Sequence, residues 1–520
     1  MKTRMLVLLC LLLSTARAAF PLAEATITDL QEQMQAGRLT SVQLTTAYLQ
    51  RVAEIDRAGP TLNSVIELNP EALAIAERLD AERAKGQVRG ALHGIPVLIK
   101  DNIGTADQMQ TTAGSLAMVG ARPAQDAAIV EQLRAAGAVI LGKTNLSEWA
   151  NFRSTKSSSG WSGRGGQTRN PYALDRNTSG SSSGSAAAVS ANLCVVAVGS
   201  ETDGSIVSPS SVCGLVGIKP TVGLLSRSGI IPISASQDTA GPMARTVRDA
   251  ALLLEAMAAV DARDAATQTR PADLATNYAA QLKVGALVGA RLGVVRGPFG
   301  LDPRLQPLLD QAVASLQAAG AEVVDLGDVK SLGTAGDPEF EVLLYEFKDG
   351  LNAYFASLGP AAPIKSLAEL IAYNQTHAAT EMPFFGQELL ESAEAKGPLT
   401  DQAYLDARAA CLKITRTDGI DALLAEHRLE ALISLANGPA WMIDPINGDP
   451  YTGGSSSPAA VAGYPSVTVP AGDYQGLPVG LLFYSTAWTE ARLLALAADF
   501  ETVTQARRPP EFRATLNRGN

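Results

Sequence analysis

Residues 180–206 read GSSSGSAAAVSANLCVVAVGSETDGSI, and the fold prediction begins with them. Ser181 lies in a first serine- and glycine-rich segment, and Ser205 lies in a second. The alanine-rich stretch between them predicts a helix, and the β-branched stretch that follows predicts a short buried strand. Glycines let backbone amides approach a ligand closely, and serines supply nucleophilic or proton-relaying hydroxyls. The two segments therefore predict one site built on a helix–strand unit.

The same alternation of helix and strand patterns continues on both sides of this stretch. Helical periodicity covers residues 41–57, 71–85, 126–136, 246–259, 303–319 and 489–505. Strand patterns cover residues 94–99, 138–141, 195–198, 292–296, 322–326, 430–435, 466–470 and 477–484. Such alternation predicts an α/β fold with helices on both faces of a β-sheet. The late strands have fewer helices between them, so we expect a mixed sheet in a single domain.

The glycine- and serine-rich region 154–185 has two interpretations. Its composition is typical of a flexible linker. It also contains Trp161, Arg164 and Tyr172, which favour a structured loop with chemistry of its own. We expect the structured loop.

The first 18 residues have the pattern of a secretory signal. Lys2 and Arg4 precede an apolar run over 5–13, and Ala18 ends a small-residue cleavage pattern. The run is shorter than the roughly 20 apolar residues that a transmembrane helix needs. We expect cleavage after Ala18, a mature domain over 19–520, and a secreted or periplasmic location. The alternative is an N-terminal helix of the folded domain.

Composition argues against several classes of function. The formal net charge is −10, and an acidic surface disfavours nucleic acid and anionic membranes as partners. Cys194 and Cys213 lie in apolar contexts, which favours buried thiols over a disulfide. The histidines form no ligand-spaced cluster, so we expect no metal and no cofactor. We also expect no membrane span, and a monomer.

Two serines compete for the role of nucleophile. Residues 180–184 match GxSxG, the nucleophile elbow of α/β-hydrolases, which would make Ser182 the nucleophile. That elbow needs a strand directly before the serine and a histidine base, but a polar loop precedes Ser182. Ser205 instead follows a buried-strand pattern, and residues 202–205 predict a tight turn whose N–H groups converge as in an oxyanion hole. The pattern favours Ser205 and leaves Ser182 as the alternative.

The base for this serine can be a histidine or a lysine. His377 and His427 lie in polar helical stretches, which is typical of solvated side chains. A lysine must be neutral to accept a proton, and burial lowers its pKa toward that state. Lys100 and Lys143 both follow apolar strand patterns, at the edge where α/β proteins build sites. The residues favour Lys100 and do not exclude Lys143.

Three segments carry a family resemblance. The chain resembles the amidase signature family, and within it the branch of bacterial peptide amidases, in GIPVLIKDN (94–102), the serine-rich segment 179–190 and GSETDGSIVSPSSVCGLVGIKPT (199–221). The likeness extends through LGKTNLSEWANFR (141–153) to GLPVGLLF (476–483), and so covers essentially the whole mature chain.

The resemblance implies a single α/β domain with a Ser–Ser–Lys triad. By position, Ser205 resembles the acyl-forming nucleophile, Ser181 the bridging serine on a cis peptide, and Lys100 the base. The oxyanion loop is matched by the backbone amides of Thr202, Asp203, Gly204 and Ser205. The implied reaction is hydrolysis of a carboxamide C–N bond, most closely the C-terminal amide of peptides, with release of ammonia. The partners would be a peptide or small-molecule amide and water.

Other activities share parts of this pattern. They are an amidase or esterase of other small amides or esters, a non-catalytic binding protein, and the amidating subunit of a tRNA-dependent amidotransferase. The predicted signal argues against the last, which is cytosolic.

Departures from the broad family pattern concern the loop and the substrate. Asp203 and Ser183 replace glycines that are usual in the family. Since a carboxylate facing the oxyanion would oppose its charge, we expect the Asp203 side chain to point elsewhere. Asp238 either holds the loop or is an ordinary turn residue. For the substrate lining we expect aromatic residues of segment 335–400, or else a core role for the same residues: Tyr345, Phe347, Tyr354, Phe384 and Phe385.

Overall fold

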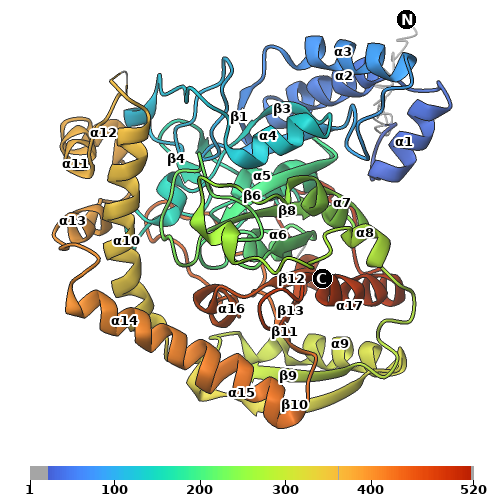
Figure 1. The fold of residues 1–520 in the computed structure, drawn as a ribbon, viewed down its shortest axis with the longest axis vertical. Helices are drawn as coiled ribbons and strands as arrows, with labels where there is room; N and C mark the ends of the chain where they lie inside the picture. The colour runs from blue at the N-terminus through green and yellow to red at the C-terminus, as the bar shows by residue number, and fades with distance from the viewer. Residues whose placement is uncertain (1–20, 361, 517–520) are drawn as a thin grey trace, which may run out of the picture.

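One large β-sheet runs through the molecule (Figure 1). The structure is a computed structural model that describes residues 21–360 and 362–516, so the predicted signal over 1–18 lies outside the described residues. The sheet has 11 strands. In spatial order they are β1 (Val65–Leu68), β3 (Val139–Thr144), β2 (Pro96–Lys100), β6 (Val196–Glu201), β8 (Thr239–Ala244), β7 (Val216–Lys219), β12 (Ser466–Tyr474), β13 (Leu477–Tyr484), β11 (Ala431–Leu435), β9 (Arg291–Gly297) and β10 (Glu322–Asp328).

The sheet is mixed, as predicted. β2 pairs in parallel with both β3 and β6, and β9 pairs in parallel with β10 and β11. The strands between these two groups pair antiparallel. Every residue of β2, β3 and β6 is buried, which explains why these strands read as continuous apolar runs.

Helices cover both faces of this sheet in one α/β domain. Against its strands pack α5 (Ser183–Ser190), α6 (Val207–Val212), α7 (Val247–Met257), α9 (Gln306–Ala318) and α17 (Glu490–Thr504). Around these lie α1 (Ile27–Gln35), α2 (Ser41–Arg51), α3 (Ala72–Ala84), α4 (Ala128–Ala135), α8 (Tyr278–Gln281), α15 (Asp421–His427) and α16 (Ser457–Ala462).

A group of helices stands beside one half of the sheet, in yellow and orange at the left of Figure 1. It contains α10 (Gly336–Ser357), α11 (Leu367–Thr376), α12 (Ala378–Glu381), α13 (Glu388–Glu394) and α14 (Gln402–Leu412). Phe347 and Leu351 of α10 join Trp149 and Phe152 in a hydrophobic cluster that ties this group to the body of the domain. Because α10 is anchored in this way, it also forms one wall of the site described below.

All the predicted helices and strands are present, with small shifts at their ends. A capping box at Thr40 and Gln43 starts α2, but the α-helix ends at Arg51 and a π-helical turn follows over Val52–Asp56. The strands of the large sheet that are missing from the prediction are β1, β7 and β8. β8 contains Gly241 and Pro242, which are unfavourable in strands, yet a side chain at Gly241 would collide with the Ile218 carbonyl of β7.

The glycine- and serine-rich region 154–185 is structured, so the linker interpretation is wrong. Trp161–Ser162 pairs with Gly166–Gln167 in a small hairpin, and the Trp161 ring is buried. The buried cysteines Cys194 and Cys213 are free thiols, as predicted, and so is Cys411. No helix among the described residues is long and apolar enough to cross a membrane.

Candidate active site

Lys100 and Ser200 meet at the ends of two neighbouring strands. β2 and β6 run parallel, so their carboxyl ends lie at the same edge of the sheet, where open α/β folds place their sites. Lys100 is the last residue of β2, and its Nζ donates to the Ser200 carbonyl at 3.1 Å and to the Ser200 hydroxyl at 3.0 Å. The amine is therefore held by β6 with no contact to solvent.

Ser181 completes the coordination of this amine. Lys100 Nζ donates to Ser181 Oγ at 2.7 Å, and the serine is fully buried. The peptide bond between Gly180 and Ser181 is cis, as the resemblance implied. A side chain at position 180 would lie 2.2 Å from Ser147 Oγ, so only glycine fits there. The Ser181 carbonyl accepts the Ser147 amide at 3.1 Å, which fixes the segment that carries the hydroxyl.

Ser205 lies on the turn that follows β6. Gly204 has φ +76°, a conformation that favours glycine, and this tight turn places Ser205 in the wall of a cavity of about 490 Å³. Gly180 lines the same cavity. The Ser205 carbonyl accepts the Ser182 amide at 3.1 Å, so the two serine-rich segments are joined directly. The two segments therefore lie side by side, as a single site would require.

The position of Ser182 argues against the elbow alternative. Its side chain is fully buried, donates to the Ser200 carbonyl at 3.0 Å and accepts the Ser200 amide at 3.2 Å. Neither histidine considered as its base lines the cavity. His377 is exposed and stacks on Tyr373, and His427 ends α15. Ser182 thus braces β6 and does not face the cavity.

The two candidate lysines have separate surroundings. Lys143 donates to the Ile103 carbonyl and, at 3.0 Å, to Thr111 Oγ1. Burial lowers the pKa of Lys143 to about 8. Burial also lowers the pKa of Lys100 to about 7, although the negative charges of Asp238 and Glu201 act to raise it. Near neutral pH a large fraction of Lys100 is therefore an uncharged amine in contact with a serine hydroxyl. Only Lys100 of these two lysines contacts Ser181, so the geometry favours Lys100 where the spacing left both open.

Carboxylates behind the turn hold its backbone in place. Glu201 Oε2 accepts the amides of Ile206 and Val207 at 2.7 and 3.0 Å. Asp238 Oδ1 accepts Thr202 Oγ1 at 2.6 Å, while its Oδ2 accepts the amides of Ile233 and Ser234 at 2.7 and 2.9 Å. Asp238 therefore holds the turn, which is one of the two roles considered for it from the sequence. The role of Glu201 in holding the turn was not predicted, because a glutamate at the end of a strand has no distinctive sequence pattern.

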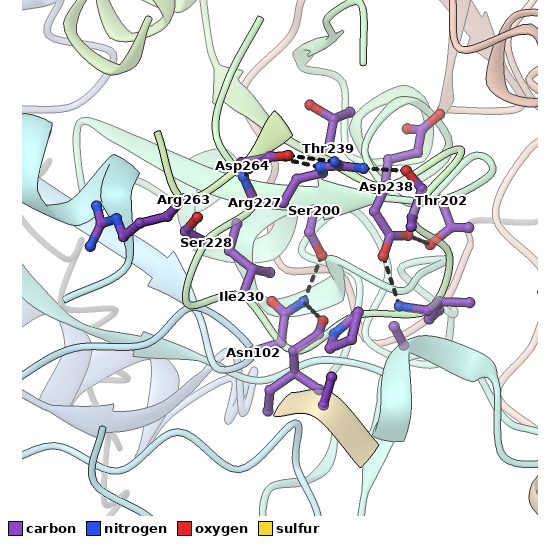
Figure 2. Close-up of a pocket in the computed structure, with 17 residues that line it drawn as sticks. Asn102, Ser200, Thr202, Arg227, Ser228, Ile230, Asp238, Thr239, Arg263 and Asp264 are labelled. Atoms are coloured by element: carbon purple, nitrogen blue, oxygen red, sulfur yellow. Dashed lines mark hydrogen bonds and ion pairs between the residues drawn. The ribbon is translucent and has the colours of Figure 1, made fainter. Parts of the chain in front are cut away.

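Asp238 also lines a second cavity, of about 370 Å³, which Figure 2 shows. Its carboxylate links the Thr202 hydroxyl to the Ile233 amide, and in that view Asn102 Nδ2 donates to Ser200 Oγ at 2.9 Å. The second cavity shares Thr202, Ala150 and Ile233 with the cavity of Ser205. These three residues lie between the two cavities, and Asp238 holds two of them, Thr202 and Ile233, through hydrogen bonds.

Removing the Asp238 carboxylate should therefore displace the turn. In Asp238→Ala, the Thr202 hydroxyl and two amides lose their acceptor, and we expect unfolding free energy to fall by about 2–3 kcal/mol. We also expect kcat to fall about tenfold or more, with a smaller change in KM. Denaturant unfolding and steady-state kinetics measure the two effects. An unchanged kcat would show that the turn keeps its position without Asp238.

The Asp203 carboxylate is bound by hydroxyl donors at the start of α16, although Asp203 also lines the cavity. Its two carboxylate oxygens accept Ser456 Oγ at 2.5 Å and Ser457 Oγ at 2.6 Å, at the start of α16. Buried Glu339 of α10 lies beside it, and the proximity of Asp203 together with burial raises the pKa of Glu339 well above its usual range. Asp203 thus joins the turn to α10 and α16.

Of the two interpretations of the aromatic residues in segment 335–400, the core role holds for Phe347 and Tyr354, and none of the five lines the cavity. From that segment only Leu343 lines the cavity, and the aromatic lining comes from Phe152, Trp441 and Tyr451. The predicted residues have other roles. Phe347 and Tyr354 are in the hydrophobic cluster, Tyr345 donates to Asp401, Phe384 packs on Trp161, and Phe385 packs on Trp161 and Arg153. The aromatics that do line the cavity belong to loops without periodicity.

The chemistry of the site rests on serine, lysine and backbone groups. Within residues 21–360 and 362–516, no group of three or more His, Cys, Asp or Glu side chains is placed to hold a metal ion. What the geometry offers is a buried amine of lowered pKa, a hydroxyl bound to it, and a second hydroxyl on a turn of backbone amides that faces a cavity. This arrangement suits acyl transfer through a serine.

Comparison with known proteins agrees with this chemistry. The Amidase family model matches residues 43–494. The solved structure of native peptide amidase from Stenotrophomonas maltophilia is 55% identical, with a TM-score of 0.91 over 95% of this chain and 99% of that chain. Peptide amidase PAM in complex with the competitive inhibitor chymostatin is 54% identical, with a TM-score of 0.92 over 94% of this chain and 100% of that chain. A probable amidase of Arabidopsis thaliana is 42% identical, covering 96% of this chain and 93% of the relative. The chain therefore belongs to the amidase family and is a hydrolase of amide C–N bonds.

Proposed function

We propose that this amidase removes the C-terminal amide of peptides as ammonia, with Ser205 as nucleophile, Ser181 as bridge and Lys100 as base. The observation that carries the proposal is the Lys100–Ser181 contact of 2.7 Å, buried behind the cavity that Ser205 lines. The likeness to peptide amidases along almost the whole chain supports the choice of substrate.

The first half of the reaction forms an acyl-enzyme. Neutral Lys100 accepts the proton of Ser181, which accepts that of Ser205 as its oxygen attacks the amide carbonyl carbon. The amides of residues 202–205 stabilise the oxyanion, and a single donor of this kind is worth about 3–4 kcal/mol. The relay then returns the proton to the amide nitrogen, the C–N bond breaks, and ammonia leaves.

Water completes the cycle. It attacks the ester carbonyl and passes its proton through Ser181 to Lys100, and the proton returns to Ser205 as the acid leaves. Asp203 and Asp449 are the carboxylates that line the cavity, and no lysine, arginine or histidine lines it. The carboxylate product is therefore repelled, while the uncharged amide is not, which favours binding of the amide over the acid.

The activity is tested by ammonia release from matched peptides. A peptide amide should release one ammonia per molecule and become the free acid, while the free-acid peptide of the same sequence should release none. Ser205→Ala is the control for contaminating activity. Release of ammonia only from small aryl or alkyl amides, with none from peptide amides, would contradict the peptide substrate while leaving the amidase in place.

The pH dependence tests Lys100 as the base. Because the amine is neutral only above its pKa of about 7, kcat/KM should be constant at higher pH and fall as pH drops through about 7. The Asp238 charge raises this pKa, so Asp238→Asn should move the acid limb to lower pH. Profiles of kcat/KM for both enzymes measure the shift. A limb that stays in place in the variant would argue against Lys100 as the titrating group.

We further propose that the protein is exported. The support is the pattern of the first 18 residues alone, and N-terminal sequencing of protein from the medium or periplasm tests cleavage after Ala18.

A further inference from the structure

We propose that the loop between β11 and α16, residues 436–456, gives the enzyme a preference for cationic substrates, with Asp449 binding a positive group close to the scissile amide. This inference rests on the proposed peptide amidase activity and specifies its substrates. The loop contributes Trp441, Asp449 and Tyr451 to the cavity that contains Ser205. A loop of this length without regular structure is commonly a binding loop.

The loop presents an aromatic corner to the cavity. The rings of Trp441 and Tyr451 pack edge to face, with centroids 5.7 Å apart and an interplanar angle of 88°. Trp441 is buried and anchors the corner, while Tyr451 is 56% exposed although it lines the cavity. A large exposed ring at the wall of a cavity is available to a ligand, and the face of such a ring attracts cations.

Asp449 supplies a negative charge that the protein itself does not neutralise. Its Oδ2 accepts the Ser159 amide at 2.7 Å and its Oδ1 accepts Asn177 Nδ2 at 3.1 Å, and both donors are uncharged. Asp449 takes part in no salt bridge within the described part of the chain. Burial raises its pKa, so the ionised form is costly as the protein stands. A cation from the substrate would reduce that cost.

Asp449 is also connected to the catalytic segment. Asn177, which donates to Asp449, accepts the Ser179 amide at 2.7 Å through its Oδ1. Ser179 precedes the cis peptide that carries Ser181 and itself lines the cavity. A group bound at Asp449 therefore lies on the same wall as the serine-rich segment. This places the charge preference on residues close to the amide and not on distant parts of a peptide.

The experiment compares substrates of equal size and different charge. N-acetylated dipeptide amides carry lysine, norleucine or glutamate at the amide-bearing residue or at the residue before it. For at least one of these positions, the wild-type kcat/KM should favour lysine over norleucine by about fivefold to tenfold and disfavour glutamate by a similar factor. In Asp449→Asn both ratios should fall to within about twofold of unity.

The ratio separates recognition from a structural role. Loss of the Asp449 contacts to Ser159 and Asn177 would lower the rates for all substrates together and leave the ratio unchanged. The matched control is Asp444→Asn in the same loop, because Asp444 also accepts backbone amides but does not line the cavity. This control should keep the wild-type ratios. Tyr451→Leu should lower the lysine preference by about twofold to threefold, through loss of the ring face.

Two results would overturn the inference. One is a wild-type enzyme that hydrolyses the lysine and norleucine amides equally well at both positions. The other is a lysine preference that persists unchanged in Asp449→Asn. Neither result would affect the proposed function, which is judged on hydrolysis of the uncharged norleucine amides and its dependence on Ser205.

Discussion

Lys100→Met is expected to lower kcat by about 10³- to 10⁴-fold while the protein stays folded. Methionine has a similar length and no amine, so Ser181 loses the group to which its proton would pass. The melting temperature should not fall, because burying the lysine amine itself costs free energy, as its lowered pKa indicates. Single-turnover kinetics and thermal unfolding measure the two effects.

Lys143→Met is the matched control for this prediction. Lys143 is equally buried and also sits at the end of a strand, but its amine contacts Ile103 and Thr111, not a serine of the site. We expect it to retain most of the wild-type kcat and the wild-type pH profile. If Lys143→Met were inactive but folded and Lys100→Met retained near-normal turnover, the assignment of the base would be wrong.

Ser205→Ala should abolish formation of the acyl-enzyme and lower kcat by about 10⁴-fold or more. Ser205 is the serine at the turn that faces the cavity, and alanine removes its hydroxyl with little effect on packing. Mass spectrometry after treatment with a serine-directed phosphonate should show one adduct on the wild type and none on the variant. Peptide mapping should place the wild-type adduct on Ser205.

Ser182→Ala separates this prediction from the elbow hypothesis. Its hydroxyl contacts the backbone of Ser200, so alanine should reduce the unfolding free energy by about 1–2 kcal/mol. The variant should still form the phosphonate adduct. A Ser182→Ala protein that is folded but not labelled, together with a labelled Ser205→Ala protein, would support the elbow hypothesis, in which Ser182 is the nucleophile.

Local patterns predicted most strands of the large sheet and the two serine-rich segments that lie side by side. Buried strands such as β2 and β6 are apolar along their whole length, and α2 begins at a capping box, so both signals lie within a few residues of sequence. β8 was missed because its glycine and proline resemble a turn, and its place is secured by close contact with β7. The lining by Trp441 and Tyr451 was missed because a loop without periodicity carries no signal of what it faces.

The chain's order of residues was sufficient to predict the α/β class and to favour Ser205 over Ser182, because these predictions depend on short-range patterns, while the role of Ser181 came from the family resemblance. The choice between Lys100 and Lys143 needed the strand order. β2 lies between β3 and β6, so the lysine of β2 is the one that reaches Ser200 and Ser181, while Lys143 of β3 lies one strand farther away. The lowered pKa of Lys100 and the uncompensated charge of Asp449 likewise arise from burial among segments far apart in the chain. Burial and strand order are collective properties of the fold, and no local spacing of residues encodes them.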